Sequence, residues 1–373
     1  MPKTLDIVVL GLSLRSSWGN GHATTYRALL GALQQRGHRV LFLERDVPWY
    51  AEHQDSTDGD AGDSSITLRL YRDLDELRDQ HAEAVRHADL VIVGSYVPDG
   101  IAVGEWVQAE AGGVVAFYDI DTPVTLAALA RGRCDYLEPR LVPGYDLYLS
   151  FTGGRVLDVL QRRYGAPLAL PLYCCVDPRR YAPEQVPPRW DLGYMGTYSD
   201  DRQPALEALL LQPARRWPQG RFVVAGPQYP DSIAWPENVQ RIEHLAPAQH
   251  RRFYNQQRFT LNITRADMVA AGWSPSVRLF EAAACATPII SDDWPGLDTF
   301  FVPEREILLA HSADEVLQRV RGLSEQQRRR IGDAARARVL AEHTAAHRAE
   351  TLERYIDRAA HASAPRPIEA EST

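Results

Sequence analysis

One stretch of the chain, residues 273–293, limits what the protein can fold into. Its sequence is WSPSVRLFEAAACATPIISDD, in which Ser274 or Ser276 can cap a helix and Pro275 is tolerated in the first turn. Apolar residues then recur at helical spacing, and a Thr-Pro pair ends the helix just before the apolar run Ile289–Ser291. A helix followed at once by a buried strand is typical of parallel α/β sheets, which bind ligands where their strands end.

Three polar residues of this helix indicate a ligand that is anionic and carries hydroxyl groups. The helix start at Ser276 offers backbone amides and Arg278 offers a guanidinium, and together they suit an anion. Glu281, one turn later, offers a carboxylate to the hydroxyls of a sugar. A helix packed on a strand with an exposed Arg–Glu pair would show the same residues, so that alternative stays open.

Length, charge and cysteine content narrow the class of protein. A chain of 373 residues suits two domains, and a net charge of −8 argues against general binding to nucleic acids or membrane surfaces. Lys3 is the only lysine, so contacts to phosphate must come from arginine, hydroxyl or backbone groups. The four cysteines form neither a CxxC pair nor a metal-binding spacing. We expect free thiols, a cytoplasmic location and no transmembrane segment, and the oligomeric state stays open.

The N-terminal half begins like a Rossmann domain. The apolar run 5–12 predicts a buried strand, a glycine-bearing loop and a helix follow it, and residues 40–43 predict a second strand. The loop holds only a fragment of the dinucleotide fingerprint, because Thr24 stands at the next glycine position. Glu44 does end the second strand, but the combined signal for NAD is weak. The acidic segment 55–65 lacks the terminal glutamate of a calcium loop and is interpreted as a mobile insertion.

Glycines in two loops of this half could let a ligand approach the backbone. Gly19 and Gly21 precede His22, which could serve as a base or donate to phosphate, although a loop histidine can equally be a surface or capping residue. Gly153 and Gly154 stand at a predicted helix start, where their amides could hold an anion. Tight packing would demand the same two glycines, and the sequence does not separate these readings.

Two carboxylates follow the buried strand predicted at residues 114–118. Asp119 and Asp121 lie at its carboxyl end, where α/β sheets place ligand chemistry, and strand alternation should point them to opposite sides. We therefore expect one to face the cleft as a general base for an incoming hydroxyl and the other to cap the helix near Thr122. Asp121 is the preferred base, Asp119 is the alternative, and both could be capping groups.

The C-terminal half shows a second unit of the same kind. A strand predicted at residues 191–196 ends in Gly196, which permits close approach to the backbone. The loop after it carries Thr197, Tyr198 and Arg202, all able to reach a phosphate or a base. Arg265 follows another buried strand and is placed to bind a diphosphate, or to form a salt bridge with a nearby acid.

The residues from Ser276 to Asp293 resemble the donor-nucleotide motif of GT-B glycosyltransferases, and most of all that of the CgeB-like (spore maturation protein-like) branch. The sequence Tyr-Asp-Ile-Asp-Thr-Pro at 118–123 is also similar to that branch. The resemblance implies that Glu281 binds ribose hydroxyls and that His244 lies in the loop that holds the nucleobase. Many relatives carry two glutamates separated by seven residues, and Trp273 stands at the position of the first.

The sequence therefore predicts an α/β protein of GT-B fold, with two Rossmann-like domains facing across a cleft. Residues 1–183 would form the acceptor-side domain and residues 189–343 the nucleotide-sugar-binding domain. A helix at 344–361 would pack back on the first domain, followed by a disordered tail at 362–373.

The predicted activity is that of a hexosyltransferase-type glycosyltransferase, which uses a nucleotide-diphosphate sugar as donor substrate and needs no cofactor and no metal. The acceptor stays open among a glycan, a small molecule, a protein and a modified nucleic acid. The alternatives are a non-catalytic nucleotide-sugar-binding protein and a sugar-nucleotide epimerase of the same fold.

Overall fold

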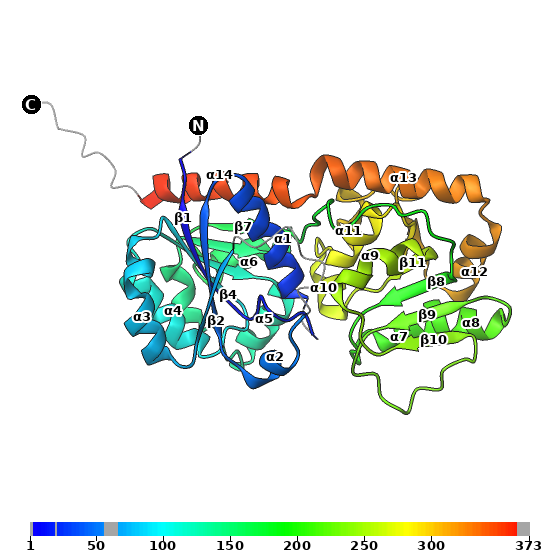
Figure 1. Ribbon diagram of the computed structural model, residues 1–373, viewed down its shortest axis with the longest axis horizontal. Helices are drawn as coiled ribbons and strands as arrows, with labels where there is room; N and C mark the ends of the chain where they lie inside the picture. Colours follow the sequence, from blue (N-terminus) through cyan, green and yellow to red (C-terminus); the bar gives the residue numbers. More distant parts are fainter. Residues whose placement is uncertain (1–2, 19–20, 56–65, 364–373) are drawn as a thin grey trace, which may run out of the picture.

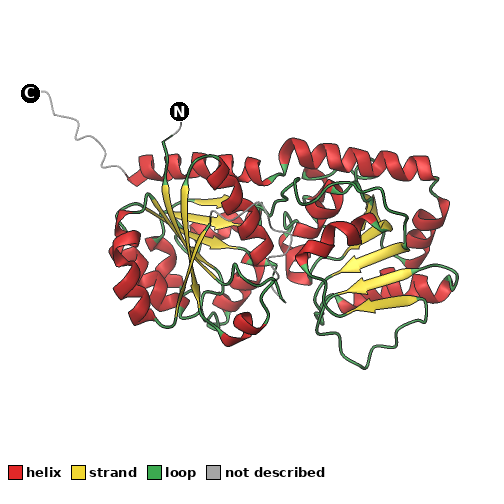
Figure 2. Ribbon diagram, in the orientation of Figure 1, coloured by secondary structure: helices red, strands yellow, loops and turns green. Residues whose placement is uncertain are grey.

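Two parallel-sheet domains lie side by side and are spanned by one long C-terminal helical segment (Figure 1). The computed structural model describes residues 3–18, 21–55 and 66–363, so the predicted insertion after Asp55 and the last ten residues of the predicted tail lie outside the described residues. Helices cover both faces of each sheet (Figure 2). No helix in the described part of the chain is long and apolar enough to cross a membrane.

The N-terminal domain is built on a seven-stranded parallel sheet in the order β3-β2-β1-β4-β5-β6-β7. Its elements are β1 (Asp6–Gly11), α1 (His22–Gln35), β2 (Arg39–Arg45), α2 (Pro48–Glu52), β3 (Thr67–Tyr71), α3 (Leu74–His87), β4 (Leu90–Gly94), α4 (Gly100–Glu110), β5 (Val114–Asp119), α5 (Thr122–Ala130), η1 (Pro139–Gly144), β6 (Leu147–Ser150), α6 (Arg155–Arg162) and β7 (Ala169–Pro171).

The C-terminal domain is built on a six-stranded parallel sheet in the order β10-β9-β8-β11-β12-β13. Its elements are β8 (Trp190–Met195), α7 (Gln203–Leu206), η2 (Glu207–Leu211), α8 (Gln212–Arg216), β9 (Phe222–Ala225), β10 (Val239–Ile242), α9 (Pro247–Asn255), β11 (Gln257–Asn262), α10 (Ala266–Ala271), α11 (Val277–Ala284), β12 (Ile289–Ser291), η3 (Leu297–Thr299), β13 (Leu308–Leu309), α12 (Ala313–Gly322), α13 (Glu325–Glu342) and α14 (Ala345–Ser363).

Period-two burial explains why these segments are strands covered on both faces. In β1, Val8 and Leu10 pack in the core on one face of the sheet, whereas Ile7 and Val9 pack in the core on the other. The central strands are therefore apolar throughout, as parallel strands buried on both faces must be. The strand order reverses beside β1 in the first sheet and beside β8 in the second. These are the switch points at which open α/β sheets leave a crevice.

The last strand of each sheet is short. In the first sheet, β7 pairs with β6 and the chain then leaves the sheet after Pro171. In the second sheet, β13 is limited to Leu308–Leu309, because Glu304 has a φ of 63° and forms a turn instead of extended backbone. Its amide donates to the carbonyl of Ile307 at 2.7 Å and closes that turn.

The last helix, α14, packs on the N-terminal domain although the preceding helix, α13, belongs to the C-terminal one (Figure 1). Five of its buried apolar residues join the same core as the inner face of α1, namely Ala345, Ala349, Leu352, Ile356 and Ala359. Glu353 binds both Arg36 and His38 at the edge of this contact. The helix runs to Ser363, two residues into the segment that the sequence predicts to be disordered.

Leu352→Ala tests how much this return helix contributes to stability. The side chain is fully buried, so its truncation should lower the free energy of unfolding by about 2–4 kcal/mol through lost burial and a residual cavity. Urea denaturation would measure the loss. Glu350→Ala is the matched control, because this exposed residue pairs only with Arg354 and should change stability by no more than about 0.5 kcal/mol. Equal stability of both variants would show that α14 adds little.

Candidate active site

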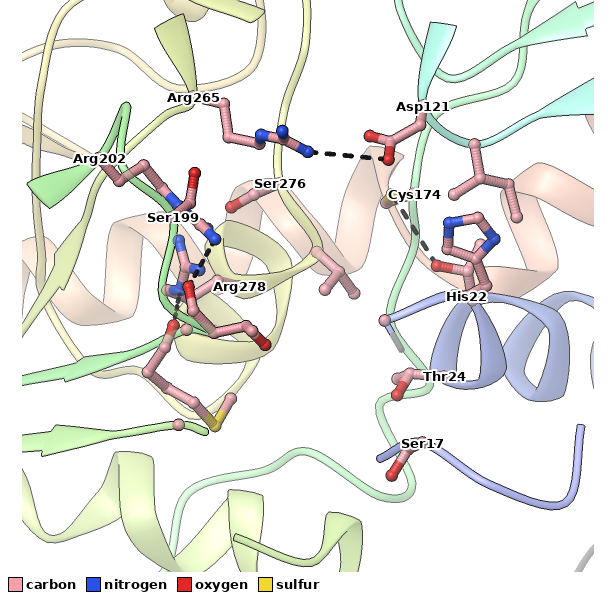
Figure 3. A pocket seen from close by; sticks show the side chains of 18 of the residues that line it. Ser17, His22, Thr24, Asp121, Cys174, Ser199, Arg202, Arg265, Ser276 and Arg278 are labelled. Atoms are coloured by element: carbon pink, nitrogen blue, oxygen red, sulfur yellow. Dashed lines mark hydrogen bonds and ion pairs between the residues drawn. The ribbon is translucent and has the colours of Figure 1, made fainter. Parts of the chain in front are cut away.

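A cavity of about 830 Å³ lies where the carboxyl edges of the two sheets face each other (Figure 3). Its N-terminal wall comes from the loops after β1, β4 and β5 and from the start of α1. Its C-terminal wall comes from the loops after β8, β9 and β11 and from the start of α11. Most of the residues predicted for donor and acceptor binding therefore meet in one space between the domains.

Glu281 lies on α11 at the buried end of this cavity. The residue is only 1% exposed, and its Oε2 accepts a hydrogen bond of 2.8 Å from the hydroxyl of Tyr254. A carboxylate held in this way is oriented before any ligand arrives. It is not part of an exposed Arg–Glu surface pair, so that alternative reading of the helix is wrong.

Arg278 and Ser276 are tied to Asn262 at the end of β11. Asn262 Oδ1 accepts from Arg278 Nη1 at 2.8 Å and from Ser276 Oγ at 2.9 Å, and Arg278 Nε donates to the carbonyl of Met195. Ser276 is the N-cap of α11 by position, but its hydroxyl makes no capping hydrogen bond. Arg278 is 8% exposed and its Nη2 has no hydrogen-bond partner among the described residues, so one nitrogen is left for an anion in the cavity.

Arg265 reaches from the C-terminal domain toward the N-terminal one (Figure 3). Its Nη1 lies 4.0 Å from Asp121 Oδ2, and its Nε lies 3.7 Å from Asp201 Oδ2. The predicted salt bridge with a nearby acid is thus present, but the partners are Asp201 and, across the cleft, Asp121. The side chain is 35% exposed and lines the cavity, which leaves it accessible to an anionic ligand.

The loop after β8 forms the floor on the donor side. Gly196, Thr197, Tyr198 and Arg202 all line the cavity. Arg202 Nη2 donates to the carbonyl of Thr197 at 2.6 Å, and the Tyr198 hydroxyl donates to Asp200 at 2.6 Å. These contacts hold the loop in its conformation. Arg202 therefore stabilises the backbone that a ligand would contact.

A glycine after β9 allows two loops to touch. Gly226 has a φ of 145°, and a Cβ placed there would lie 2.0 Å from the carbonyl oxygen of Gly196. Only glycine permits this approach. The floor of the cavity is therefore a continuous surface made by the ends of β8 and β9.

His244, predicted to lie at the nucleobase, borders the cavity and stacks on a residue of the other domain. Its ring centroid lies 3.8 Å from that of Trp18. Burial lowers the pKa of His244, so the ring is mostly neutral near pH 7 and can stack on an uncharged nucleobase. Trp18 also contacts His53, which in turn stacks on Trp49, so a row of rings extends from the cavity along the N-terminal domain.

The two candidate bases are placed very differently. Asp121 lines the cavity, whereas Asp119 is fully buried and accepts from Tyr148 at 2.7 Å and from Thr125 at 2.8 Å. The two carboxylates are separated as expected, but not through strand alternation, which points residues two positions apart to the same side. Strand β5 ends at Asp119, and the backbone of Asp121 has left the extended conformation, with a φ of −142° and a ψ of 39°. The predicted capping of α5 by one of the carboxylates is not found. Asp121 itself occupies the N-cap position, and neither carboxylate caps that helix through its side chain. Of the two, Asp121 alone can reach a ligand.

His22 is the first residue of α1 and lines the cavity on the same side as Asp121. Its ring makes an edge contact with Tyr96 at 5.4 Å between centroids, and it lines the cavity together with Gly21. Burial lowers the pKa of His22, against a smaller opposing effect of Asp121, so the neutral form is favoured. A neutral imidazole can accept a proton or donate a hydrogen bond here. Gly19 lies outside the described residues.

Gly153 and Gly154 do not line the cavity. The prediction that they bind an acceptor or an anion is therefore wrong, and the alternative, tight packing, is what the structure has. The amide of Gly153 donates to the carbonyl of Trp273 at 3.0 Å. Gly154 has a φ of 62°, and a Cβ there would meet the Trp273 ring at 2.5 Å. Thr152 adds a hydroxyl contact of 3.0 Å to Ser274. Trp273 therefore packs at the interface between the domains and does not line the cavity.

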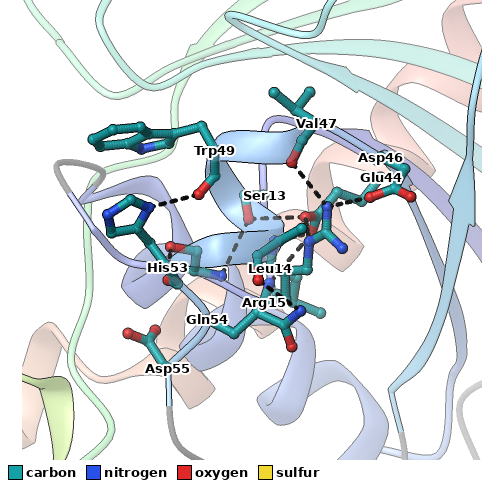
Figure 4. Close-up of polar contacts among 12 residues, drawn as sticks. Ser13, Leu14, Arg15, Glu44, Asp46, Val47, Trp49, His53, Gln54 and Asp55 are labelled. Carbon is teal, nitrogen blue, oxygen red and sulfur yellow. Dashed lines mark hydrogen bonds and ion pairs between the residues drawn. The ribbon is translucent and has the colours of Figure 1, made fainter.

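Glu44, the acidic residue that formed part of the weak signal for NAD, is held in a buried ion pair (Figure 4). Glu44 is fully buried and accepts from the Ser13 hydroxyl and from the backbone amides of Leu14 and Arg15. Its Oε1 also lies 2.8 Å from Nε of Arg15 in an ion pair. A carboxylate occupied by its own loop cannot also bind a ribose. The acidic residue at the end of β2 holds the first loop in place instead.

Two residues of the site were missed by the sequence analysis. Asn262 anchors Arg278 and Ser276, and Tyr96 donates a hydrogen bond of 2.9 Å to Asp121. Both stand at or just after the carboxyl end of a central strand. The rule that drew attention to Asp121, namely that such positions share one edge of the sheet, would have found them.

Comparison with known proteins agrees with this geometry. Residues 202–354 match a family model described as glycosyl transferase-like. The sucrose-phosphate synthase of Thermosynechococcus elongatus is 16% identical with a TM-score of 0.68, over 96% of this chain and 99% of that one. HepE of Anabaena, solved with UDP and glucose, is 11% identical with a TM-score of 0.69, over 95% and 100%.

An alpha-glucosyltransferase solved with UDP-glucose and DNA containing an abasic site is 13% identical with a TM-score of 0.72, over 95% of this chain and 100% of that one. The fold is GT-B. The predicted fold class is thereby confirmed, and so is the predicted enzyme class, a glycosyltransferase, at the level of this fold and of the family match. None of the curated proteins compared with the chain matches it.

Asp119→Asn tests the buried carboxyl beside the site through the pH dependence of stability. Burial raises the pKa of Asp119 to about 6, although its hydrogen bonds oppose that rise. A raised folded-state pKa adds stability that is complete below the unfolded value near 4 and is lost as pH rises through about 6. The variant lacks this loss, so the stability difference between the two proteins should change by up to about 3 kcal/mol between pH 4 and pH 7.

Urea denaturation at a series of pH values would measure that difference. Asp357→Asn, on the exposed face of α14, is the control and should follow the wild type at every pH. A difference between Asp119→Asn and the wild type that is independent of pH would contradict the assignment of a raised pKa to Asp119.

Proposed function

We propose that this protein is a glycosyltransferase that transfers a sugar from a nucleoside-diphosphate donor, held by the C-terminal domain, to a hydroxyl presented by the N-terminal domain. The observation that carries the proposal is the convergence in one cavity of Arg265, Arg278 and Glu281 from one domain and of Asp121 from the other. The cationic groups suit a diphosphate, the buried carboxylate suits ribose hydroxyls, and Asp121 suits the proton of an acceptor.

The reaction would divide between the two walls. As the bond from the anomeric carbon to the diphosphate oxygen breaks, negative charge develops on the leaving group, and Arg265, Arg278 and the amides at the start of α11 would stabilise it. As the bond to the acceptor oxygen forms, the hydroxyl proton would pass to Asp121. The pair formed by Arg265 and Asp121 across the cleft would link the two events, because one guanidinium neighbours both the base and the leaving group.

We propose UDP as the nucleotide and a reaction that needs neither a metal nor a resident cofactor. The neighbours solved with UDP or UDP-glucose support the first point. The chemistry of the described residues supports the second, because the groups around the donor are arginines, hydroxyls and backbone amides, which can neutralise a diphosphate without a divalent ion. Membership of the CgeB-like branch is part of the same proposal and rests on residues 276–293 and 118–123.

A non-catalytic nucleotide-sugar-binding protein was the main alternative, and Trp273 was its only support. The structure gives Trp273 a packing role at the domain interface, so its presence no longer argues against turnover. An epimerase would give a new nucleotide sugar without any acceptor. Product analysis after incubation with UDP-glucose alone therefore distinguishes it from a transferase, which would leave the nucleotide sugar unchanged or release UDP and glucose by transfer to water.

Glu281→Gln is the sharpest test of the donor site. The substitution keeps the shape but removes the charge, so UDP should bind more weakly by about 1.5–3 kcal/mol, the scale of a hydrogen bond to a charged group. Isothermal titration calorimetry with UDP, GDP, CDP and NAD, with EDTA and with Mg²⁺, would measure this. Glu281→Ala should lose at least as much affinity, but it also leaves the Tyr254 hydroxyl without its acceptor.

Glu243→Gln serves as the matched control, because Glu243 does not line the cavity. The proposal predicts binding of UDP by the wild type and the control in EDTA. It would be refuted by NAD binding alone, by unchanged UDP affinity in Glu281→Gln, or by binding that requires Mg²⁺.

Asp121→Asn separates binding from turnover. Asp121 belongs to the opposite domain from the donor groups, so UDP affinity should stay close to that of the wild type. Turnover should fall by roughly 10²–10⁴-fold, the usual contribution of a general base. Release of UDP from UDP-glucose, with water as the acceptor of the sugar, would be followed with a coupled assay. Asp146→Asn is the control, because Asp146 does not line the cavity and its carboxylate accepts from the amide of Val115. Full activity of Asp121→Asn would move the role of base to His22.

A further inference from the structure

Tyr96 stands out among the described residues that line the cavity. It is the one non-glycine residue there with a left-handed backbone, at a φ of 64°. For a bulky side chain this conformation is rare and strained. Such strain persists only where the surrounding structure imposes it, and it is found most often at functional sites.

The surrounding contacts hold Tyr96 in this conformation from both sides. The preceding residue, Ser95, is fully buried and joins the ends of two strands: its amide donates to the carbonyl of Tyr118 at 3.0 Å, and its hydroxyl accepts from the amide of Ile120 at 3.2 Å. The ring of Tyr96 lies between Tyr136, at 4.6 Å, and the edge of His22, at 5.4 Å. The side chain is therefore directed to the end of β5, where Asp121 lies.

The result is a hydrogen bond to one particular oxygen of the candidate base. The Tyr96 hydroxyl donates to Asp121 Oδ2 at 2.9 Å, and Arg265 approaches the same oxygen from the other domain. Burial and the neighbouring carboxylate raise the pKa of Tyr96 strongly, so the hydroxyl stays protonated and remains a donor. Among the described residues, Asp121 Oδ1 has no hydrogen-bond partner.

We infer that Tyr96 is a positioning residue of the transfer reaction, which fixes Oδ2 of Asp121 so that Oδ1 is presented to the acceptor hydroxyl. This inference rests on the proposed function. Without this hydrogen bond the carboxylate would be free to rotate, and a displacement of about 1 Å at a reacting group costs about 10²-fold in rate.

Tyr96→Phe tests the inference with Tyr136→Phe as its matched control. Each variant loses one hydroxyl from neighbouring, contacting rings, but the Tyr136 hydroxyl bonds to Thr125 and not to Asp121. With UDP-glucose as the probe and water as the acceptor, release of UDP and glucose is the readout, and Tyr96→Phe should lose about 10–100-fold in kcat. The KM for UDP-glucose and the affinity for UDP by calorimetry should stay within about twofold of the wild type. Tyr136→Phe should keep the wild-type kcat.

A crystal structure of Tyr96→Phe gives a second measurement that needs no turnover, and the Asp121 carboxylate should have turned away from its wild-type orientation. An unchanged carboxylate, an unchanged kcat, or the same loss in Tyr136→Phe would overturn the inference alone. Absence of UDP binding by the wild type would instead overturn the proposed function, and this inference with it.

Discussion

The structure depends on one hydrogen-bonded contact between the two segments that cross from domain to domain. The first crossing follows β7 and the second is the break between α13 and α14, and they meet where Val176 pairs with Thr344. The amide of Ala345 donates to the carbonyl of Val176 at 2.9 Å, and the buried Arg348 donates to the carbonyls of Tyr173 and Glu342. Because both crossings are fixed to each other, the carboxyl edges of the sheets face across one cavity.

Burial sets the protonation state of the side chains where the two crossings meet. His343, at the break between the helices, accepts from Arg348 at 2.9 Å and packs against Phe280 and Phe300. Burial, with the neighbouring arginines, lowers the pKa of His343 to about 3. The ring is therefore neutral at pH 7 and can accept from Arg348. Arg348 is then the charged member of this pair. Its guanidinium donates to backbone carbonyls, and a buried cation needs such hydrogen-bond partners.

Much of the fold and of the donor wall could be predicted from local patterns, for a definite physical reason. A parallel strand buried on both faces is apolar throughout, and the polar residue that follows it must lie at the ligand edge of the sheet. That reasoning places Asp121, Arg265 and Gly196 in the cavity, where the structure has them. It works because strand alternation and strand direction are properties of a short segment.

What could not be predicted depends on contacts between distant segments. Gly153 and Gly154 appear as an anion site in the sequence, because a Gly-Gly helix start exposes its amides. Only the approach of Trp273 from the other domain takes up one amide and fills the space above the other glycine. Glu44 is similar, since its partners are on the loop after β1, about thirty residues earlier in the chain. In both cases the residue type is compatible with a ligand, and a long-range partner decides the outcome.

The same distinction explains why Trp273 need not weaken the proposed activity. A glutamate at this position would have to face the cavity, yet the backbone here has a φ of 43°, and Gly154 and Gly296 leave room for a large ring on the interface side. The loop is thus shaped to direct its side chain into the interface between the domains. A contact to a donor sugar would have to come here from another part of the cavity wall, because Trp273 does not line the cavity. The groups proposed to bind the diphosphate and the ribose, namely Arg265, Arg278 and Glu281, do line it, so Trp273 does not disturb them.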